Sequence, residues 1–126
     1  MRTAPSPIYE MYADIFKALG HPTRVQIVRY LKDGEHAVSN IVAAVGGEQS
    51  NVSRHLSVLK QARVLTSRKD GLKVFYKLSS PRLVEAVDCI LSCVQDIIRI
   101  RLHMGESLLE GFEETGGGPP PKAHAK

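Results

Sequence analysis

The sequence contains no apolar run long enough to cross a bilayer, and no signal-like apolar segment follows Met1. We therefore expect a cytoplasmic protein without a membrane partner.

Cysteine is scarce: the chain has two, Cys89 and Cys93. In the reducing cytoplasm we expect both side chains to be thiols rather than a permanent disulfide bridge.

Motifs for catalysis are missing as well. The chain has no glycine-rich phosphate loop, nucleophile elbow, pair of inward carboxylates or metal-hydrolase histidine spacing. The three glycines of residues 116–118 follow no predicted strand, which a dinucleotide-binding loop would require. These absences predict that the protein is not an enzyme.

Acidic residues are nearly absent from the stretch between Gln49 and Leu78, where Asp70 stands alone. The same stretch contains seven basic residues, which are Arg54, Lys60, Arg63, Arg68, Lys69, Lys73 and Lys77. The whole chain has a formal net charge of +4, which is too small a surplus to indicate a partner by itself. A local positive stretch, in contrast, is what contact with nucleic-acid phosphates requires.

A length of 126 residues with 43% hydrophobic content is typical of one domain with a real core. We expect that domain to span residues 8–111, after a flexible lead at residues 1–7. Residues 112–126 combine acidic residues with runs of glycine and proline. Such a composition buries little apolar surface, so we expect a disordered tail.

The hydrophobic pattern predicts five helices and one hairpin. Apolar residues recur at helical spacing in five segments, which are Ile8–Leu19, Pro22–Leu31, Val38–Val45, Gln49–Ala62 and Pro81–Leu102. Two strands, Leu65–Lys69 and Lys73–Leu78, flank the turn-forming dipeptide Asp70-Gly71. This order predicts a mainly α fold with a β-hairpin wing, the winged helix-turn-helix.

The segment from Gln49 to Ala62 is the candidate recognition helix. Its apolar side holds Val52, Leu56, Leu59 and Ala62, and polar or basic residues cover the rest. We expect the following residues of this helix and the hairpin to contact DNA: Gln49, Ser50, Asn51, Ser53, Arg54, His55, Lys60, Arg68, Lys69 and Lys73. For His55 two roles stay open, a hydrogen bond to the DNA backbone or support of the helix. Glu48 is a poor start for a DNA-facing helix, because Ser or Asp caps better and a carboxylate repels phosphates.

The last predicted helix has an apolar stripe covering more than half of its circumference. A stripe this broad requires two neighbours, the chain's own core and a second copy of the chain. It therefore predicts a homodimer.

Four segments resemble the ArsR/SmtB family of repressors when taken in order along the chain. Ala18–Arg24 is similar to that family's entry into its second helix, and Gln49–Leu56 with Leu59–Ala62 resembles its recognition helix. Arg68–Lys73 followed by Phe75–Leu78 is similar to its wing. The resemblance implies a dimer built from the first and last helices, repression by occupying a promoter, and release by an inducer.

The resemblance does not supply the inducer. The third predicted helix lacks the cysteines with which many members bind thiophilic metals. On the last helix, His103 and Glu106 resemble half of a second metal site, but Ile90 and Ser92 stand where we would seek its other ligands.

Cys89 and Cys93 lie four residues apart, on one face of the last helix. Three readings stay open: both are small residues at the edge of the buried stripe, both bind arsenite or another thiophilic ion as inducer, or both are oxidised by peroxide or reactive sulfur. Arsenite prefers three thiolates, so a site for it would need a second protomer. A winged-helix module that binds protein or RNA, without an inducer, is the functional alternative.

Overall fold

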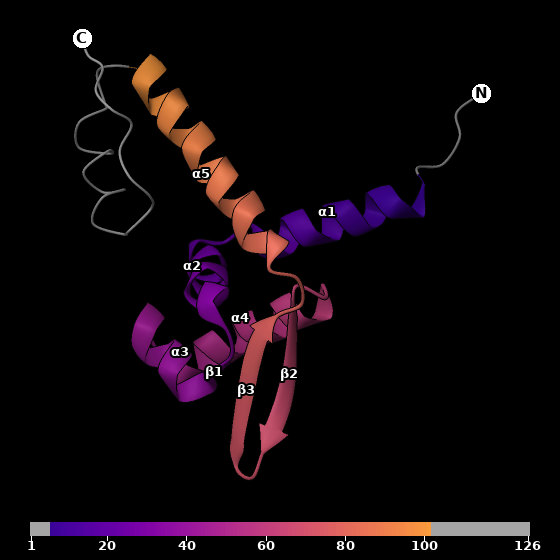
Figure 1. Cartoon of the computed structure of the whole chain (residues 1–126), viewed down its shortest axis with the longest axis vertical. Coiled ribbons are helices and arrows are strands. Elements are labelled where there is room, and N and C mark those ends of the chain that lie inside the picture. The colour runs from indigo at the N-terminus through magenta and orange to yellow at the C-terminus, as the bar shows by residue number, and fades with distance from the viewer. Residues whose placement is uncertain (1–5, 102–126) are drawn as a thin grey trace. The chain divides into compact units, whose positions relative to one another are not determined.

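The computed structural model describes residues 6–101, which contain nine elements (Figure 1). In chain order these are α1 (Pro7–Leu19), α2 (Pro22–Tyr30), the 3-10 helix η1 (Leu31–Asp33), β1 (His36–Ala37), α3 (Val38–Val45), α4 (Gln49–Gln61), β2 (Leu65–Asp70), β3 (Lys73–Leu78) and α5 (Arg82–Ile100). The chain forms two compact units, which divide between Val84 and Glu85. The predicted winged helix-turn-helix order is confirmed, with the short β1 and η1 as additions.

Local sequence signals explain where the first two helices begin and end. The Ser6 hydroxyl caps α1 by accepting the backbone N–H of Ile8 at 3.3 Å, and Pro7 occupies the first turn, where its missing N–H costs nothing. Helix α1 ends at Gly20. An imidazole caps α2: His21 Nδ1 accepts the backbone N–H of Thr23 at 3.1 Å.

The first unit buries one apolar core. Helices α2, α3 and α4 pack against one another, and α4 also packs against α1 and β2. The largest fully buried side chains are Ile27, Val28, Leu31, Ile41, Val52, Leu56, Leu59, Val64 and Leu65. Three of them come from α4. The candidate recognition helix is therefore fixed by the centre of the core.

The three strands form an antiparallel sheet in the order β1-β3-β2. In the hairpin, Leu65 pairs with Leu78 and Asp70 pairs with Lys73. The two-residue turn is therefore Gly71-Leu72, and Asp70 belongs to the strand rather than to the turn, where the sequence had placed it. Gly71 has a φ of +66°, which a residue without a Cβ adopts at little cost.

Helix α5 runs for 19 residues, most of them in the second unit. Its first turn is supported by the Ser80 hydroxyl, which accepts the backbone N–H of Arg82 at 3.3 Å. Ile90, Ile97 and Ile100 are exposed in the single chain. Among residues 6–101, no helix is both long enough and apolar enough to cross a membrane. The predicted tail lies outside the described residues.

Candidate nucleic-acid interface

Helix α4 has one buried face and one hydrophilic face. Val52, Leu56 and Leu59 have at most 1% of their surface exposed. The exposed residues of the helix are Gln49, Ser50, Asn51, Arg54, Ser57, Lys60 and Gln61, and Ser53 is half-buried. Amides, hydroxyls and cations on a helix held from behind are the groups that read base edges and bind phosphates.

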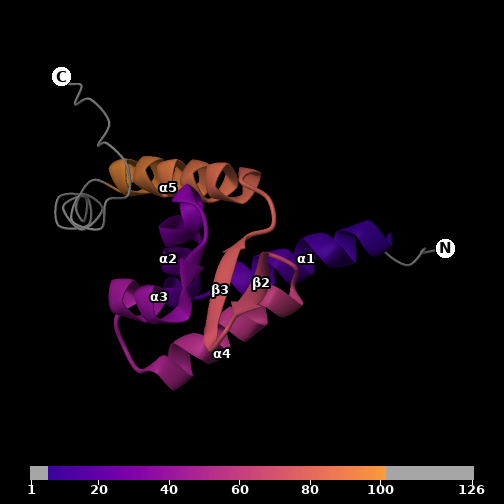
Figure 2. The ribbon, with the colours of Figure 1, turned by 60° about the horizontal axis from the view of Figure 1, so that its bottom comes forward.

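Three residues, Gly46 to Glu48, connect α3 to α4, so the two helices form the helix-turn-helix (Figure 2). Gly46 ends α3 with a φ of +80°, a backbone conformation that favours glycine. Glu48 occupies the N-cap position of α4 without a side-chain hydrogen bond to the helix. The predicted poor cap is thus present at the end of the helix where Gln49 and Ser50 lie.

The β2–β3 hairpin ends in the Gly71-Leu72 turn (Figure 1). Lys69, Lys73 and Lys77 are exposed on it, and the side chain of Leu72 is fully exposed at the tip. The hairpin therefore presents positive charge to solvent on a scaffold of ladder hydrogen bonds. This arrangement suits contact with a phosphate backbone.

A groove of about 330 Å³ lies between the start of α4 and the hairpin. Its polar lining comes from Gln49 and Ser53 of α4, Lys73 and Tyr76 of β3, and Ser39 of α3. The structure thus brings three predicted DNA contacts together around one concave surface. Sequence reasoning missed Ser39, which precedes the basic stretch, and Tyr76, which lies in that stretch but is neither basic nor on the recognition helix.

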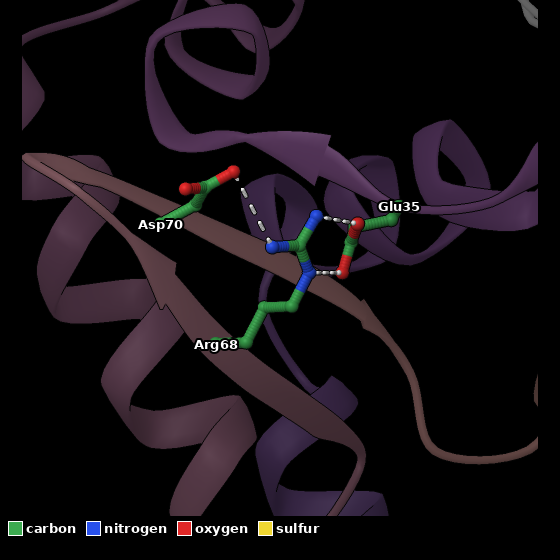
Figure 3. A network of polar contacts seen from close by, with 3 residues as sticks. All are labelled: Glu35, Arg68 and Asp70. Atoms are coloured by element: carbon green, nitrogen blue, oxygen red, sulfur yellow. Dashed lines mark hydrogen bonds and ion pairs between the residues drawn. The ribbon is translucent and has the colours of Figure 1, made fainter.

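Arg68 has a protein partner, which the sequence prediction of a DNA contact did not include. Its Nε and Nη2 each donate to one carboxylate oxygen of Glu35 at 2.8 Å, and its Nη1 lies 3.8 Å from Asp70 (Figure 3). The guanidinium also lies over the Phe75 ring, 4.6 Å from the centroid. The hydrogen bond and charge of Arg68 lower the pKa of Glu35. Arg68 therefore fastens the hairpin to the segment before β1, and because its side chain stays half exposed, its contact with DNA stays a prediction.

His55 is buried, with 6% of its surface exposed. Its Nδ1 accepts a hydrogen bond from Arg24 Nε at 3.1 Å, and its ring lies 4.3 Å from the ring of His21. Of the two roles predicted for His55, the structure therefore favours support of the helix over contact with DNA. The helical period could have predicted that His55 is buried, because positions 52, 55, 56 and 59 share one face of the helix.

Both cysteines are exposed free thiols on α5, so neither is a core residue within one chain. Among residues 6–101, no group of three or more His, Cys, Asp or Glu side chains is placed to hold a metal ion. His103 and Glu106, the other predicted ligands, lie outside the described residues. The described part of one protomer thus offers two thiols and no complete metal site.

Comparison with known proteins identifies the family of this helix-turn-helix chain. Residues 21–67 match the model of the family described as bacterial regulatory protein, arsR family. The HTH-type transcriptional regulator Rv0081 of Mycobacterium tuberculosis is 31% identical over 110 residues, which cover 86% of this chain and 96% of that protein. The chain belongs to the arsR family. The HTH-type transcriptional repressor SmtB of M. tuberculosis is 33% identical over 95 residues, covering 75% of this chain and 70% of SmtB.

Two solved structures have the same fold. The crystal structure of M. tuberculosis Rv0081 matches with a TM-score of 0.68 and 30% identity, covering 78% of this chain and 99% of that one. Mb0332 of Mycobacterium bovis, described as a homodimeric winged helix-turn-helix DNA-binding domain, matches with a TM-score of 0.64 and 24% identity over 82% of this chain and 97% of that one. Because it belongs to the arsR family and is similar to HTH-type transcriptional regulators, the chain is a DNA-binding transcriptional regulator, and the prediction that it is not an enzyme is confirmed.

Proposed function

We propose that this protein is a cytoplasmic homodimeric repressor that binds a palindromic operator and leaves it when an inducer binds. The observation that carries the proposal is the division of α4 into a core face and an exposed polar face. A helix anchored in this way enters the major groove as a rigid reading element. The exposed lysines of the hairpin then meet the adjacent backbone.

The roles of individual side chains follow from their positions. Gln49, Ser50 and Asn51 lie in the first turn of α4, the part of a recognition helix that approaches base edges. Arg54 is one turn further along the exposed face and suits a guanine edge or a phosphate. The groove between α4 and the hairpin suits a backbone phosphate, because Lys73 supplies charge and Ser53 supplies a hydroxyl donor.

The homodimer rests on the apolar surface of α1. This helix buries Ala18 but leaves five large apolar side chains exposed in the single chain, which are Ile8, Tyr9, Met11, Tyr12 and Phe16. A patch of this kind marks an association surface. The exposed isoleucines of α5 form another apolar surface in the second unit. A second copy that covers both surfaces would place two α4 helices on the two halves of a palindrome.

Binding to a duplex that contains the protein's own promoter tests the repressor. We expect sequence-specific binding in the nanomolar range at physiological salt, with an Arg54→Ala variant weaker by about 1–3 kcal/mol. Lys32→Ala is the control, because it removes one exposed positive charge from η1, outside the interface. Equal losses in the two variants, or no preference for the promoter over random duplex, would contradict DNA reading by α4. Stronger binding to RNA would favour the alternative module.

Oligomeric state is tested by sedimentation at several concentrations. The full chain should be a dimer, and Phe16→Glu should shift it toward monomer, because a carboxylate would have to be buried in the interface. A wild-type monomer at concentrations that saturate the operator would contradict the dimer.

For release we propose that Cys89 and Cys93 sense the inducer. Both thiols are accessible and four residues apart on one helix, a spacing at which two sulfurs can bind one soft ion. Arsenite, with a third thiolate from the second protomer, or another thiophilic ion is the proposed inducer, with thiol oxidation by peroxide or reactive sulfur as the alternative. The two mechanisms differ in how they are reversed. A bound ion is removed by a chelator, whereas an oxidised thiol is restored by a reductant.

The double variant Cys89→Ser with Cys93→Ser tests this sensing. It should keep wild-type affinity for the operator and lose release by arsenite, by peroxide and by polysulfide. Wild-type release by arsenite alone supports ion sensing, and release by an oxidant with recovery in dithiothreitol supports redox sensing. Release that survives in the double variant would show that the sensor lies elsewhere.

A further inference from the structure

One guanidinium joins three helices behind the DNA-reading surface. Arg24 of α2 donates from Nε to His55 Nδ1 of α4 at 3.1 Å. Its Nη1 lies 3.3 Å from the carbonyl oxygen of Ala18 and 3.4 Å from that of Lys17, at the C-terminal end of α1. The last carbonyls of a helix lack intrahelical partners and carry partial negative charge, so they suit a cation.

The hydrogen bonds define the protonation states of two histidines. His21 Nδ1 accepts the backbone N–H of Thr23, and His55 Nδ1 accepts from Arg24. A ring nitrogen that accepts a hydrogen bond has no proton, so each neutral imidazole has its proton on Nε2. A second proton on His55 Nδ1 would remove the acceptor and place an imidazolium directly against the guanidinium.

The charges around His55 disfavour that second proton. Burial first, and then electrostatic interaction with His21, Arg24 and Arg54, lowers the pKa of His55 below its ordinary value of 6.5. On α1, Lys17 and Asp14 line a cleft of about 340 Å³ together with Arg24. Helix α3 has no charged side chain, and Arg68 and Asp70 of β2 are paired in the hairpin network.

We propose that Arg24 and His55 are positioning residues for α4, and that operator affinity falls on acidification because the link between them requires a neutral imidazole. The proposal rests on the DNA-binding function proposed above. Neither residue contacts DNA in this scheme. Arg24 holds α4 against α1 and α2, and α4 in turn presents Arg54 and its neighbours to the bases.

The direction of the pH effect distinguishes this role from a direct contact. Because the folded protein lowers the pKa of His55, the stabilisation from its neutral form is complete above pH 6.5 and is lost as the pH falls through the lowered value. A histidine that touched phosphate would act in the opposite direction, because an imidazolium adds a positive charge to the interface and strengthens binding in acid.

Fluorescence anisotropy of the full chain on its promoter duplex, at constant ionic strength between pH 7.5 and 5.5, measures this direction. Wild-type affinity should be lower at the acidic end of this range than at pH 7.5. In His55→Asn the side-chain oxygen replaces Nδ1 as acceptor and does not titrate. This variant should bind within about threefold of wild type at pH 7.5 and lose most of the pH dependence. Tighter wild-type binding in acid, or an unchanged profile in His55→Asn, would overturn the proposal.

Arg24→Met tests the other side of the link. It keeps an apolar stem, loses every donor, and should weaken operator binding by more than about tenfold at pH 7.5 with a flatter pH profile. Lys32→Met removes one exposed charge from the same unit as a matched control. Circular dichroism verifies folding, and Arg24→Lys, which keeps the charge and a single donor group, replaces Arg24→Met if that variant unfolds. Equal losses of operator affinity in Arg24→Met and Lys32→Met would show that the effect comes from net charge alone and would contradict the proposal.

Nitrogen-15 spectra of the histidine side chains test the link without DNA. Both His21 and His55 should show the Nε2–H tautomer at pH 7.5, and the pKa of His55 should rise in Arg24→Met. An Nδ1–H tautomer at His55 would refute the link. A wild-type chain that ignores its promoter but shows these spectra would contradict the repressor function and leave the helix-positioning geometry intact, so the two failures are distinguishable.

Discussion

The recognition helix and the hairpin are both proposed to contact DNA, but they are held in different ways. Helix α4 inserts Val52, Leu56 and Leu59 into the core and is joined to α2 by the hydrogen bond between Arg24 and His55. The hairpin rests on the β2–β3 ladder and on an ion pair of Arg68 in which both partners are accessible to solvent. At its tip Leu72 packs against nothing.

This difference separates two tasks of the interface. Reading bases requires side chains held within fractions of an ångström, which close packing provides. Binding phosphates requires charge at roughly the right place, which an exposed hairpin provides without a core of its own. Substitutions in α4 should therefore change stability and specificity, whereas substitutions in the hairpin should change affinity for DNA of any sequence.

The largest contrast is expected between two leucines given the same substitution. Leu56→Ala should lower the free energy of unfolding by about 2–5 kcal/mol, because it leaves a cavity in the centre of the core. Leu72→Ala should change it by less than about 0.5 kcal/mol, because no neighbour loses a contact. Urea denaturation measures both. Similar losses in the two variants would mean that the hairpin tip is packed after all.

A second contrast concerns Lys73, at the edge of the groove between α4 and the hairpin. Lys73→Ala should weaken binding to the promoter and to random duplex by the same factor. The slope of log affinity against log salt should become less steep by about 1, because one phosphate contact is lost. Salt titrations with both duplexes measure these quantities. A loss confined to the promoter would move Lys73 to the base-reading group.

Substitution of Glu35 should change affinity for DNA by less than Lys73→Ala does, and in the opposite direction. Glu35→Gln should raise affinity for any duplex by a few-fold, because it releases Arg68 and removes a negative charge beside the hairpin. The lowered pKa of Glu35 means that its ion pair stabilises the fold above pH 4.5, and that this contribution is lost as the pH falls through the lowered value. Unfolding midpoints of the variant should accordingly depend less on pH in this acidic range. A variant with unchanged DNA affinity would leave Arg68 a purely structural residue.

The same contrast explains what the sequence alone could predict. Helix α4 and both hairpin strands lie within one residue of their predicted bounds, because a helical period and a turn dipeptide are local signals. Strand β1 was missed because two residues are too short to show a period. It forms by pairing His36 with Tyr76, a contact that no local pattern contains.

The protein contacts that the sequence did not predict at the site have the same origin. Arg68 and His55 are among the predicted DNA contacts, but their protein partners, Glu35 and Arg24, lie 33 and 31 positions away in the sequence. Charge patterning counts such residues as available to phosphates, and tertiary packing decides which of them stay available. Lys69 and Lys73 are exposed, as predicted, and their contact with DNA stays a prediction.

The smallest effect is expected at the junction between helix α4 and the hairpin. Arg63 follows α4 with a φ of +66°, and its backbone N–H and that of Val64 return to the carbonyls of Lys60 and Leu59, each at 2.9 Å. This closing pattern usually employs glycine, because a Cβ in the left-handed region costs about 1–2 kcal/mol. Arg63→Gly removes that strain but adds about 0.4–1 kcal/mol of unfolded-state entropy, so we expect a net gain in stability of about 0.5–1 kcal/mol. Calorimetry should show the rise, with operator affinity within about twofold of wild type because Arg63 belongs to neither the exposed face of α4 nor the hairpin strands. A marked loss of affinity would show that the junction itself contacts DNA. The interface would then consist of three parts, helix α4, the hairpin and the junction between them.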